Sequence, residues 1–393
     1  MTGPAPTDIV IVAARRTPMG GFQGDFRDLA APALGAAAIR AVVADAGLGA
    51  DEAGEVVMGC VLPAGQGQAP ARQAALGAGL GQGTPAVTLN KMCGSGMKAV
   101  MDAADRLSAG SADIIIAGGM ESMTNAPYLL PKARGGLRLG HGVVKDHMFL
   151  DGLEDAYEPG RLMGSFAEDC ARHYQFTRAQ QDDYALESLS RANAAIASGA
   201  FAAETVAVAT KAGEVTIDEQ PGKARPEKIP TLKPAFAPDG TVTAANASSI
   251  SDGAAALVLM RRETAEARGL EPIATILGHS THAQAPAWFS TAPVPAMRKL
   301  LDRLGLSVDA IDLFEVNEAF AVVAMAAMQE LSIPHARLNV NGGATALGHP
   351  IGASGARILV TLIHALRARG GGTGLASLCI GGGEATAVAL RVG

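Results

Sequence analysis

The chain has 393 residues, of which 48% are hydrophobic and 18% are charged, and its formal net charge is −6. This mildly acidic balance argues against a nucleic-acid partner, and no uninterrupted apolar run is long enough to span a membrane. A chain of this length exceeds one ordinary core and predicts two or three domains or a pair of similar halves.

The N-terminal segment and the cysteines bear on the cellular compartment. Residues 1–8 lack the charged-then-apolar pattern of a secretion signal. Cys60, Cys93, Cys170 and Cys379 have no close paired spacing, which argues against a disulfide framework and against a zinc site. We therefore expect a soluble protein of the reducing cytoplasm, without a bound metal.

Strands and helices alternate in the first part of the chain. Apolar runs predict strands at 8–14, 55–60, 86–89 and 112–117, and helical spacing predicts helices at 34–46, at 71–80 and from Met97 onward. This alternation is typical of a layered α/β fold.

From Met120 to about Ser248 the pattern changes, because prolines interrupt it and longer helices replace the alternation. The capping-box patterns Ser165-x-x-Glu168 and Thr177-x-x-Gln180 predict two helix starts. The segment is too long to be a structureless connection. We interpret it as an ordered insertion into the sheet scaffold.

After Ile250 the alternation returns, with predicted strands at 274–278, 311–318 and 375–383, a helix at 295–304 and a glycine-rich turn at 341–355 that enters a helix. The first strand and the strand that ends in glycines are 114 − 8 = 106 residues apart in the first part and 376 − 274 = 102 in the second. This repeat predicts two similar halves that face each other, with the insertion over their junction.

Cys93 lies where the strand at 86–89 turns into a helix. A helix N-terminus favours the thiolate form of cysteine, and the glycines at 94 and 96 leave backbone N–H groups free to hold an oxyanion. A reactive nucleophile and a small buried apolar side chain both fit these residues.

Three further residues stand at glycine-rich turns or strand ends. His349, between Gly348 and Pro350, is suited to be a general base for a thiol, although a structural histidine is the ordinary alternative. Cys379 precedes a run of three glycines whose N–H groups suit an oxygen. Asn317 either positions a water or a carbonyl or caps the following helix. Because loops gather at the carboxyl ends of strands, we expect these residues to converge with Cys93.

Taken together, four segments resemble the signatures of the thiolase family in order and spacing. They are Asn-Lys-Met-Cys-Gly-Ser-Gly at 90–96, Asn-Glu-Ala-Phe at 317–320, the run from Asn341 to Gly355, and Cys-Ile-Gly-Gly-Gly at 379–383. The resemblance also includes 118–123 and 241–248 and so covers essentially the whole chain. It implies duplicated βαβαβαββ halves in an α/β/α/β/α arrangement, with a first half at 1–268 that includes an inserted helical loop domain at about 120–248, and a second half at 269–393.

The resemblance also implies an activity and the residues that carry it. The implied activity is that of an acetyl-CoA C-acetyltransferase, which condenses two acetyl-CoA reversibly to acetoacetyl-CoA and CoA. Cys93 would be the nucleophile that carries the acyl group, and His349 would be the base that activates the Cys93 thiol. Cys379 would remove the α-proton of the second acetyl-CoA in synthesis, or protonate the departing enolate in cleavage. His349 and a water held by Asn317 would stabilise the enolate, while the N–H groups of Cys93 and Gly381 would hold the tetrahedral oxyanion. Cys60 and Cys170 match no catalytic motif and are predicted to be core residues.

By the same resemblance, CoA thioesters are the substrates, namely acetyl-CoA, acetoacetyl-CoA or other 3-ketoacyl-CoA. No cofactor or metal is required, and a homo-oligomer, dimer or tetramer, in fatty acid metabolism is expected. The implied CoA contacts are Ser248, Leu153, Met163, Phe236, Ala244, Ala319 and Phe320.

Two departures from the family pattern leave the acyl chain open. Leu162-Met163-Gly164 stands where short-chain members commonly have His-Met-Gly, and Phe289-Ser290-Thr291-Ala292 stands where Met-Gly-Thr-Gly is usual. A degradative 3-ketoacyl-CoA thiolase of fatty-acid β-oxidation is therefore an alternative. A non-catalytic thiolase-like CoA- or lipid-binding protein is another, although mere binding has no need for two cysteines, a histidine and an asparagine together. Cys379, in place of a second histidine, argues against a decarboxylating ketosynthase.

Overall fold

The strands of the two halves form one continuous sheet in this computed structural model, which describes residues 5–393. Residues 1–4 of the segment searched for a secretion signal lie outside the described residues. The strand order is β12-β13-β14-β11-β1-β10-β5-β3-β4, and β2 pairs with β10. The strands of the first half are β1 (Ile9–Arg16), β2 (Gly20–Gly21), β3 (Glu55–Gly59), β4 (Ala86–Leu89), β5 (Ile114–Ser122) and β10 (Ser251–Arg261). Those of the second half are β11 (Ala274–Ala283), β12 (Leu313–Val316), β13 (Gly372–Ile380) and β14 (Glu384–Val392).

The second half repeats the topology of the first. In the first half, β1 is followed across the sheet by β10, β5 and β3. In the second half, β11 is followed in the same way by β14, β13 and β12. The last two strands of each set are parallel neighbours. Within the sheet of the described residues, the two halves join where β1 pairs with β11. The counterpart of β4 is reduced to a bridge between Phe314 and Leu338. The predicted duplication is therefore confirmed, with one strand shortened to a single contact.

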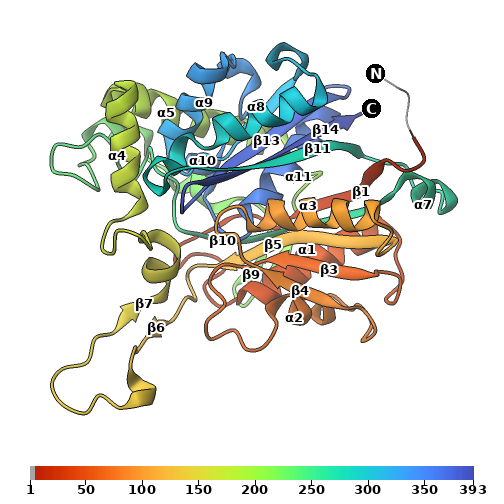
Figure 1. Cartoon of the computed structure of the whole chain (residues 1–393), viewed down its shortest axis with the longest axis horizontal. Coiled ribbons are helices and arrows are strands. Elements are labelled where there is room, and N and C mark those ends of the chain that lie inside the picture. The colour runs from red at the N-terminus through yellow and green to blue at the C-terminus, as the bar shows by residue number, and fades with distance from the viewer. Residues whose placement is uncertain (1–4) are drawn as a thin grey trace.

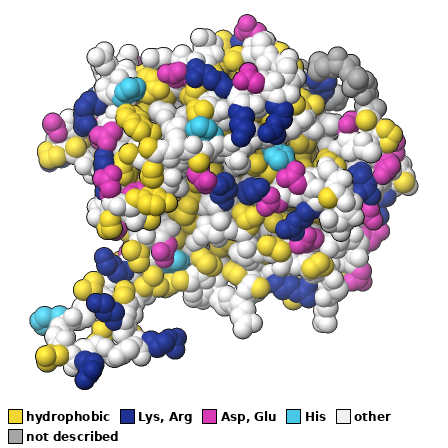
Figure 2. Space-filling model, in the orientation of Figure 1, with side chains coloured by type: hydrophobic (Ala, Val, Ile, Leu, Met, Phe, Trp, Pro, Cys, Tyr) yellow, Lys and Arg dark blue, Asp and Glu magenta, His cyan; other side chains and the backbone are white. Residues whose placement is uncertain are grey.

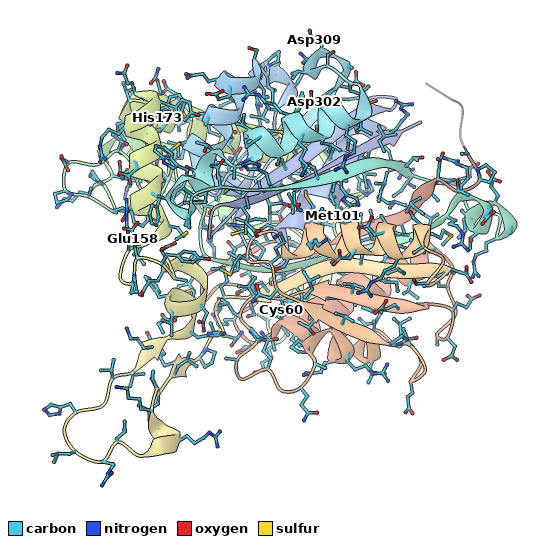
Figure 3. All side chains as sticks on the ribbon, viewed as in Figure 1. Cys60, Met101, Glu158, His173, Asp302 and Asp309 are labelled. Atoms are coloured by element: carbon cyan, nitrogen blue, oxygen red, sulfur yellow. The ribbon has the colours of Figure 1, made fainter. Side chains whose placement is uncertain are left out.

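Helices sandwich the strands in five layers, as Figure 1 shows. One outer layer consists of α1 (Ala31–Asp45) and α2 (Pro70–Gly77), and the other of α8 (Pro293–Leu304) and α9 (Ala321–Leu331). The middle layer holds α3 (Ser95–Ser108) and α11 (Ser354–Arg367), which share one buried apolar cluster with both sets of strands. Met101 marks this layer on α3 in Figure 3. The expected α/β/α/β/α arrangement is confirmed.

The two middle helices begin side by side because glycine allows their backbones to touch. A Cβ atom on Gly96 would lie 2.8 Å from the backbone nitrogen of Ala356, and one on Gly355 would collide with the backbone of Met97. Any larger residue at either position would push the helices apart. The loops that precede α3 and α11 are thereby brought to the same place.

The insertion lies between β5 and β10 and is ordered, as predicted. Its helices are α4 (Met163–Tyr174), α5 (Arg178–Ser198), α6 (Glu219–Lys223), the π-helix η2 (Phe149–Leu153) and the 3₁₀ helices η1 (Ala133–Gly135) and η3 (Pro226–Thr231). Its strands form the hairpins β6 (Tyr128–Leu129) with β7 (Lys145–Asp146), and β8 (Val208–Thr210) with β9 (Gly213–Val215). The remaining short helices of the chain are α7 (Arg262–Ala267), α10 (Ala344–Leu347), η4 (Pro286–Thr291), η5 (Val308–Ala310) and η6 (His335–Arg337). Residues 268 and 269, where we expected the halves to divide, lie in the turn between α7 and β11.

A buried ion cluster fixes the insertion to the scaffold. The Arg16 guanidinium on β1 donates to Glu204 Oε1 at 2.5 Å and to both carboxylate oxygens of Asp218, at 2.6 and 2.9 Å. All three side chains are inaccessible to solvent or nearly so. These bonds hold residues 204–218 against the first half of the molecule.

One of the two predicted capping boxes is present. Thr177 and Gln180 form both bonds of the box at the start of α5, which confirms that prediction. The box at Ser165 was wrong, because α4 already begins at Met163. The buried carboxylate of Glu168 instead accepts hydrogen bonds from the backbone N–H groups of Thr241 and Val242, at 2.9 and 2.7 Å.

Within residues 5–393 no helix has both the length and the hydropathy that a membrane crossing requires.

Candidate active site

An apolar cavity of about 380 Å³ lies between the insertion and the strand ends of the two halves. No lysine, arginine, aspartate or glutamate lines it. Ten of the twelve predicted site residues do: Cys93, His349, Gly381, Ser248, Leu153, Met163, Phe236, Ala244, Ala319 and Phe320. The structure thus brings together segments that are up to 288 residues apart, 381 − 93, in the sequence.

Cys93 lies in a tight turn between β4 and α3, as predicted. The turn begins with Met92 in a left-handed conformation, with φ of 48°. The Ser95 hydroxyl accepts from the Lys91 N–H at 2.8 Å and donates to the Met92 carbonyl at 2.6 Å. These local bonds fix the position of Cys93 against the N-terminus of α3.

Two opposing influences set the charge state of Cys93. Burial raises the pKa of its thiol to about 11, although hydrogen bonds from the Gly381 N–H and from its own N–H lower it. The effect of desolvation on this pKa therefore outweighs the opposite effect of the helix N-terminus. Cys93 is a protonated thiol at neutral pH, and its activation requires a base.

His349 has the protonation state of such a base. The Ser354 hydroxyl donates to the Pro350 carbonyl at 3.0 Å, so it can only accept from His349 Nδ1, which lies 2.5 Å away. That arrangement places the proton on Nδ1 and leaves the basic lone pair on Nε2. Burial, and secondarily the charge of Arg357, lowers the pKa of His349 to about 3. The imidazole is therefore neutral and can accept a proton at Nε2.

Asn317 and Cys379 do not line the cavity but lie directly behind it. Asn317 Nδ2 is 3.5 Å from His349 Nε2. Its predicted alternative role as a helix cap is wrong, because α9 begins at Ala321 with Phe320 at the N-cap. Cys379 is fully buried at the end of β13. Burial raises the pKa of its thiol, and the nearby charge of Cys93 raises it further, so the two thiols titrate as a coupled pair.

Sequence reasoning missed Glu121, a buried carboxylate that ties together two loops of the site. It accepts from the N–H groups of Val61 at 2.9 Å, Leu62 at 3.1 Å and Gly352 at 2.9 Å. Burial raises the pKa of Glu121 to about 7, although these bonds oppose the shift. Gly352 follows His349 by three residues, so Glu121 holds the histidine loop against the first half. An acidic residue within a buried strand was the signal available in the sequence.

A second cavity, of about 320 Å³, adjoins the first and shares Ala244 and Ser249 with it. Three cations line it, Lys223, Arg225 and Lys228, and no acidic side chain does. Lys223 is paired with Glu219, and within the described chain the side chains of Arg225 and Lys228 have no hydrogen-bond or ion-pair partner. An apolar cavity therefore continues into a cationic one.

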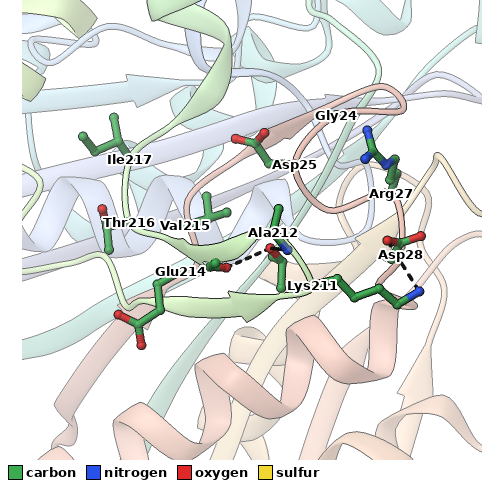
Figure 4. Close-up of a pocket in the computed structure, with 12 residues that line it drawn as sticks. Gly24, Asp25, Arg27, Asp28, Lys211, Ala212, Glu214, Val215, Thr216 and Ile217 are labelled. Carbon is green, nitrogen blue, oxygen red and sulfur yellow. Dashed lines mark hydrogen bonds and ion pairs between the residues drawn. The ribbon is translucent and has the colours of Figure 1, made fainter.

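A third cavity, of about 420 Å³, is separate from these two. Figure 4 shows it between the hairpin β8–β9 and the loop that carries Asp25 and Asp28. Its lining mixes both charges, with Lys211 Nζ 3.6 Å from a carboxylate oxygen of Asp28. It contains none of the predicted site residues, so the chemistry belongs to the first cavity. Residues 5–393 contain no group of three or more His, Cys, Asp or Glu side chains placed to hold a metal ion.

Two family models and several known proteins match nearly the whole chain. The family model for the thiolase N-terminal domain matches residues 9–263, and the model for the thiolase C-terminal domain matches residues 270–392. The acetyl-CoA acetyltransferase of Pseudomonas aeruginosa is 49% identical over 98% of this chain and 99% of its own length. Acetyl-CoA acetyltransferase 2 of Arabidopsis thaliana is 49% identical over 98% of each chain.

A solved structure also matches. The crystal structure of Acat5 thiolase from Ascaris suum in complex with coenzyme A superposes with a TM-score of 0.94, at 42% identity, over 98% of this chain and 100% of the other.

Proposed function

The chain belongs to the thiolase family, and we propose that it is an acetyl-CoA C-acetyltransferase, which condenses two acetyl-CoA reversibly to acetoacetyl-CoA and CoA. The observation that carries the proposal is the meeting of the protonated Cys93 thiol and the neutral His349 at one apolar cavity. Relatives that bear the acetyl-CoA acetyltransferase name over nearly their whole length support the same substrate.

The first half-reaction is acyl transfer to Cys93. His349 Nε2 accepts the thiol proton, and the sulfur attacks the carbonyl carbon of acetyl-CoA. The N–H groups of Cys93 and Gly381, which already point at the Cys93 sulfur, are placed to bind the oxyanion that forms. The bond to the CoA sulfur then breaks, and His349 returns the proton to that sulfur. The products are acetyl-Cys93 and CoA.

The second half-reaction forms the carbon–carbon bond. Cys379 acts here as the thiolate: it takes a proton from the methyl group of the second acetyl-CoA and becomes a thiol, and the resulting enolate attacks the acetyl carbon on Cys93. Asn317 and His349 face each other; a water held by Asn317 would donate to the enolate oxygen, and His349 can donate to it only with a proton on Nε2. The Cys93 sulfur leaves as a thiolate and takes up the proton that Cys379 removed, so that both cysteines return to their starting charge states. In the reverse direction the raised pKa of Cys379 supplies the neutral thiol that protonates the departing enolate.

The two adjoining cavities match the two ends of coenzyme A. The pantetheine arm is long and largely apolar, whereas the nucleotide carries a diphosphate and a 3′-phosphate. Among residues 5–393, Arg225 and Lys228 have no side-chain partner, and unpaired cations beside a substrate channel favour phosphate groups. This polarity supports a thioester that enters with its acyl end toward Cys93.

We also propose a homo-oligomer, either dimer or tetramer. The segment that carries β6 and β7 projects from the body of the molecule, and Figure 2 shows cationic and apolar side chains on it. Leu139 is 97% exposed, Val143 61% and Val144 59%. Apolar side chains gathered on a projection favour burial against another chain. Light scattering of the protein and of the Leu139→Asp variant tests this, with a smaller assembly expected for the variant. We also propose that the protein works in the reducing cytoplasm, because the thiols of Cys93 and Cys379 must remain reduced. Its proposed place is in fatty acid metabolism.

Acetoacetyl-CoA thiolysis tests the activity. The wild type is expected to cleave acetoacetyl-CoA in the presence of CoA and to show an acetyl adduct on Cys93 by mass spectrometry. Cys93→Ala is expected to lose both, whereas Cys170→Ala, which alters a buried cysteine outside the cavity lining, is expected to keep both. Absence of turnover by the wild type would support the non-catalytic binding protein instead.

A further inference from the structure

We propose that the ion pair between Lys91 and Glu384 positions the nucleophile against an oxyanion donor; this rests on the proposed thiolase activity. One partner belongs to the turn that carries Cys93, and the other directly follows the glycine turn that carries Gly381. The Lys91 Nζ atom lies 2.5 Å from Oε2 of Glu384, although the two residues are 293 apart in the sequence. Neither side chain lines the catalytic cavity, so both act through other residues.

Lys91 is part of the same turn as the nucleophile. Its N–H donates to the Ser95 hydroxyl at 2.8 Å, and its carbonyl accepts from the Gly94 N–H at 3.0 Å. These two bonds enclose Cys93 between Lys91 and the start of α3. A shift of Lys91 therefore shifts the backbone that carries the Cys93 sulfur.

Glu384 begins β14 directly after the glycine turn. It pairs with Ile380 across that turn, and Gly382 and Gly383 have positive φ angles of 93° and 87°. The turn is thus a tight connection of three residues. Its first N–H, that of Gly381, points at the sulfur of the nucleophile. The position of Glu384 therefore helps to determine where this N–H lies.

The ion pair gives the contact between these two turns its direction. Among the described residues it is the only side-chain hydrogen bond or ion pair that joins residues 90–95 to residues 380–384. The turns also pack where Gly94 meets Ile380, since a Cβ atom on Gly94 would lie 2.4 Å from the Ile380 Cδ1 atom. Apolar packing is non-directional, whereas a charged hydrogen bond specifies one relative position. The pair therefore sets how the oxyanion donor lies relative to the sulfur.

The expected effect on the rate is moderate. The side chains of Lys91 and Glu384 are 21% and 37% exposed, and an ion pair at such a site is worth a factor of about 1.5–5. Complete loss of an oxyanion donor costs about 10²–10³ in rate, and here the donor is retained but displaced. Without the pair we therefore expect kcat to fall by about two- to fivefold, with KM nearly unchanged because no substrate contact is lost.

Two reactions test the proposal. Acetoacetyl-CoA thiolysis uses both half-reactions, whereas exchange of labelled CoA into acetyl-CoA passes only through the acyl transfer at Cys93. Lys91→Met and Glu384→Gln should each lower kcat of both reactions by about two- to fivefold. The double variant should be no slower than either single variant, because one interaction is removed in all three. The charge-swapped variant, Lys91→Glu with Glu384→Lys, should recover most of the loss.

Lys98→Met is the matched control. Lys98 pairs with Asp102 at 2.5 Å, and their side chains are 29% and 23% exposed, but both residues lie on α3 and their pair joins no second turn. This variant should keep the wild-type kcat. Salt provides an independent measurement, because an increase in KCl from about 0.05 to about 1 M screens exposed charges. It should lower the kcat of the wild type and of Lys98→Met, but not that of Lys91→Met.

Several results would overturn the proposal. They are an unchanged kcat in the folded Lys91 and Glu384 variants, an equal loss in Lys98→Met, a loss confined to KM, and a charge-swapped variant as slow as the single ones. Thermal unfolding shows which variants are folded, and if the single variants are not, the salt dependence of the wild-type kcat decides. A wild type that cleaves acetoacetyl-CoA alongside one of these results retains the thiolase activity and removes only this proposal, whereas a wild type without turnover removes both.

Discussion

Replacement of Ser354 by alanine is expected to slow the chemistry without weakening substrate binding. The Ser354 hydroxyl is the acceptor of His349 Nδ1 at 2.5 Å and is completely buried. Ser354 does not line the cavity. The variant therefore leaves the substrate contacts intact but deprives the imidazole of the bond that fixes its tautomer and its orientation.

The size of the effect follows from that single bond. A buried donor left without its acceptor costs about 1–3 kcal/mol. Since about 1.4 kcal/mol corresponds to a factor of ten, we expect kcat for acetoacetyl-CoA thiolysis to fall by about 5–150-fold, with KM changed by less than about twofold. Ser354→Thr keeps the hydroxyl and is expected to recover most of the loss.

Ser280→Ala provides the control. The Ser280 hydroxyl is also buried and donates to the Ala296 carbonyl at 2.6 Å, but it does not touch His349. The reasoning would be refuted if Ser354→Ala kept the wild-type kcat, if its loss lay in KM alone, or if Ser280→Ala lost as much activity. Thermal unfolding of each variant shows that the comparison is made between folded proteins.

Three further predictions concern other parts of the molecule. Because burial raises the pKa of Cys93 to about 11, its alkylation by iodoacetamide in the free enzyme should be slow at pH 7 and accelerate up to about pH 11, whereas a plateau below pH 8 would contradict that pKa. Arg16→Met leaves the Asp218 carboxylate buried without its cation, and urea unfolding should show a loss of about 3–5 kcal/mol; a loss below about 1 kcal/mol would mean that the cluster does not anchor the insertion. The double variant Arg225→Gln and Lys228→Gln should raise KM for acetoacetyl-CoA several-fold but not KM for acetoacetyl-pantetheine, which lacks the phosphates, and an equal effect on both substrates would exclude a phosphate contact.

The elements that the sequence predicted well are those with local causes. The strand at 86–89 and the helix after Cys93 follow from apolar spacing within a few residues. Thr177 and Gln180 satisfy each other across one turn, so their box survives in the fold. The residues that line the cavity were predicted from the family motifs and not from the spacing of apolar residues.

The misses have tertiary causes. Glu168 had the spacing of a capping box, but the N–H groups of Thr241 and Val242, far along the chain, compete for its carboxylate. The helix N-terminus favours the Cys93 thiolate, but burial raises the pKa of this thiol to about 11, and burial is set by the tertiary packing around the turn rather than by the turn itself. No local pattern marks Ser354 as the partner of His349, since many helices begin with serine.

The duplicated scaffold explains why the nucleophile and its base come from different halves. In the first half the edge strand β4 leads through Cys93 into α3, and in the second the bridge at Leu338 leads through a longer turn with His349 into α11. The two residues therefore occupy corresponding turns, and these turns meet because α3 and α11 touch at Gly96 and Gly355. The insertion covers only one side of this junction, since it interrupts only the first half. A nearly symmetric framework thus acquires one substrate cavity, in which one turn supplies the sulfur and the other supplies the imidazole.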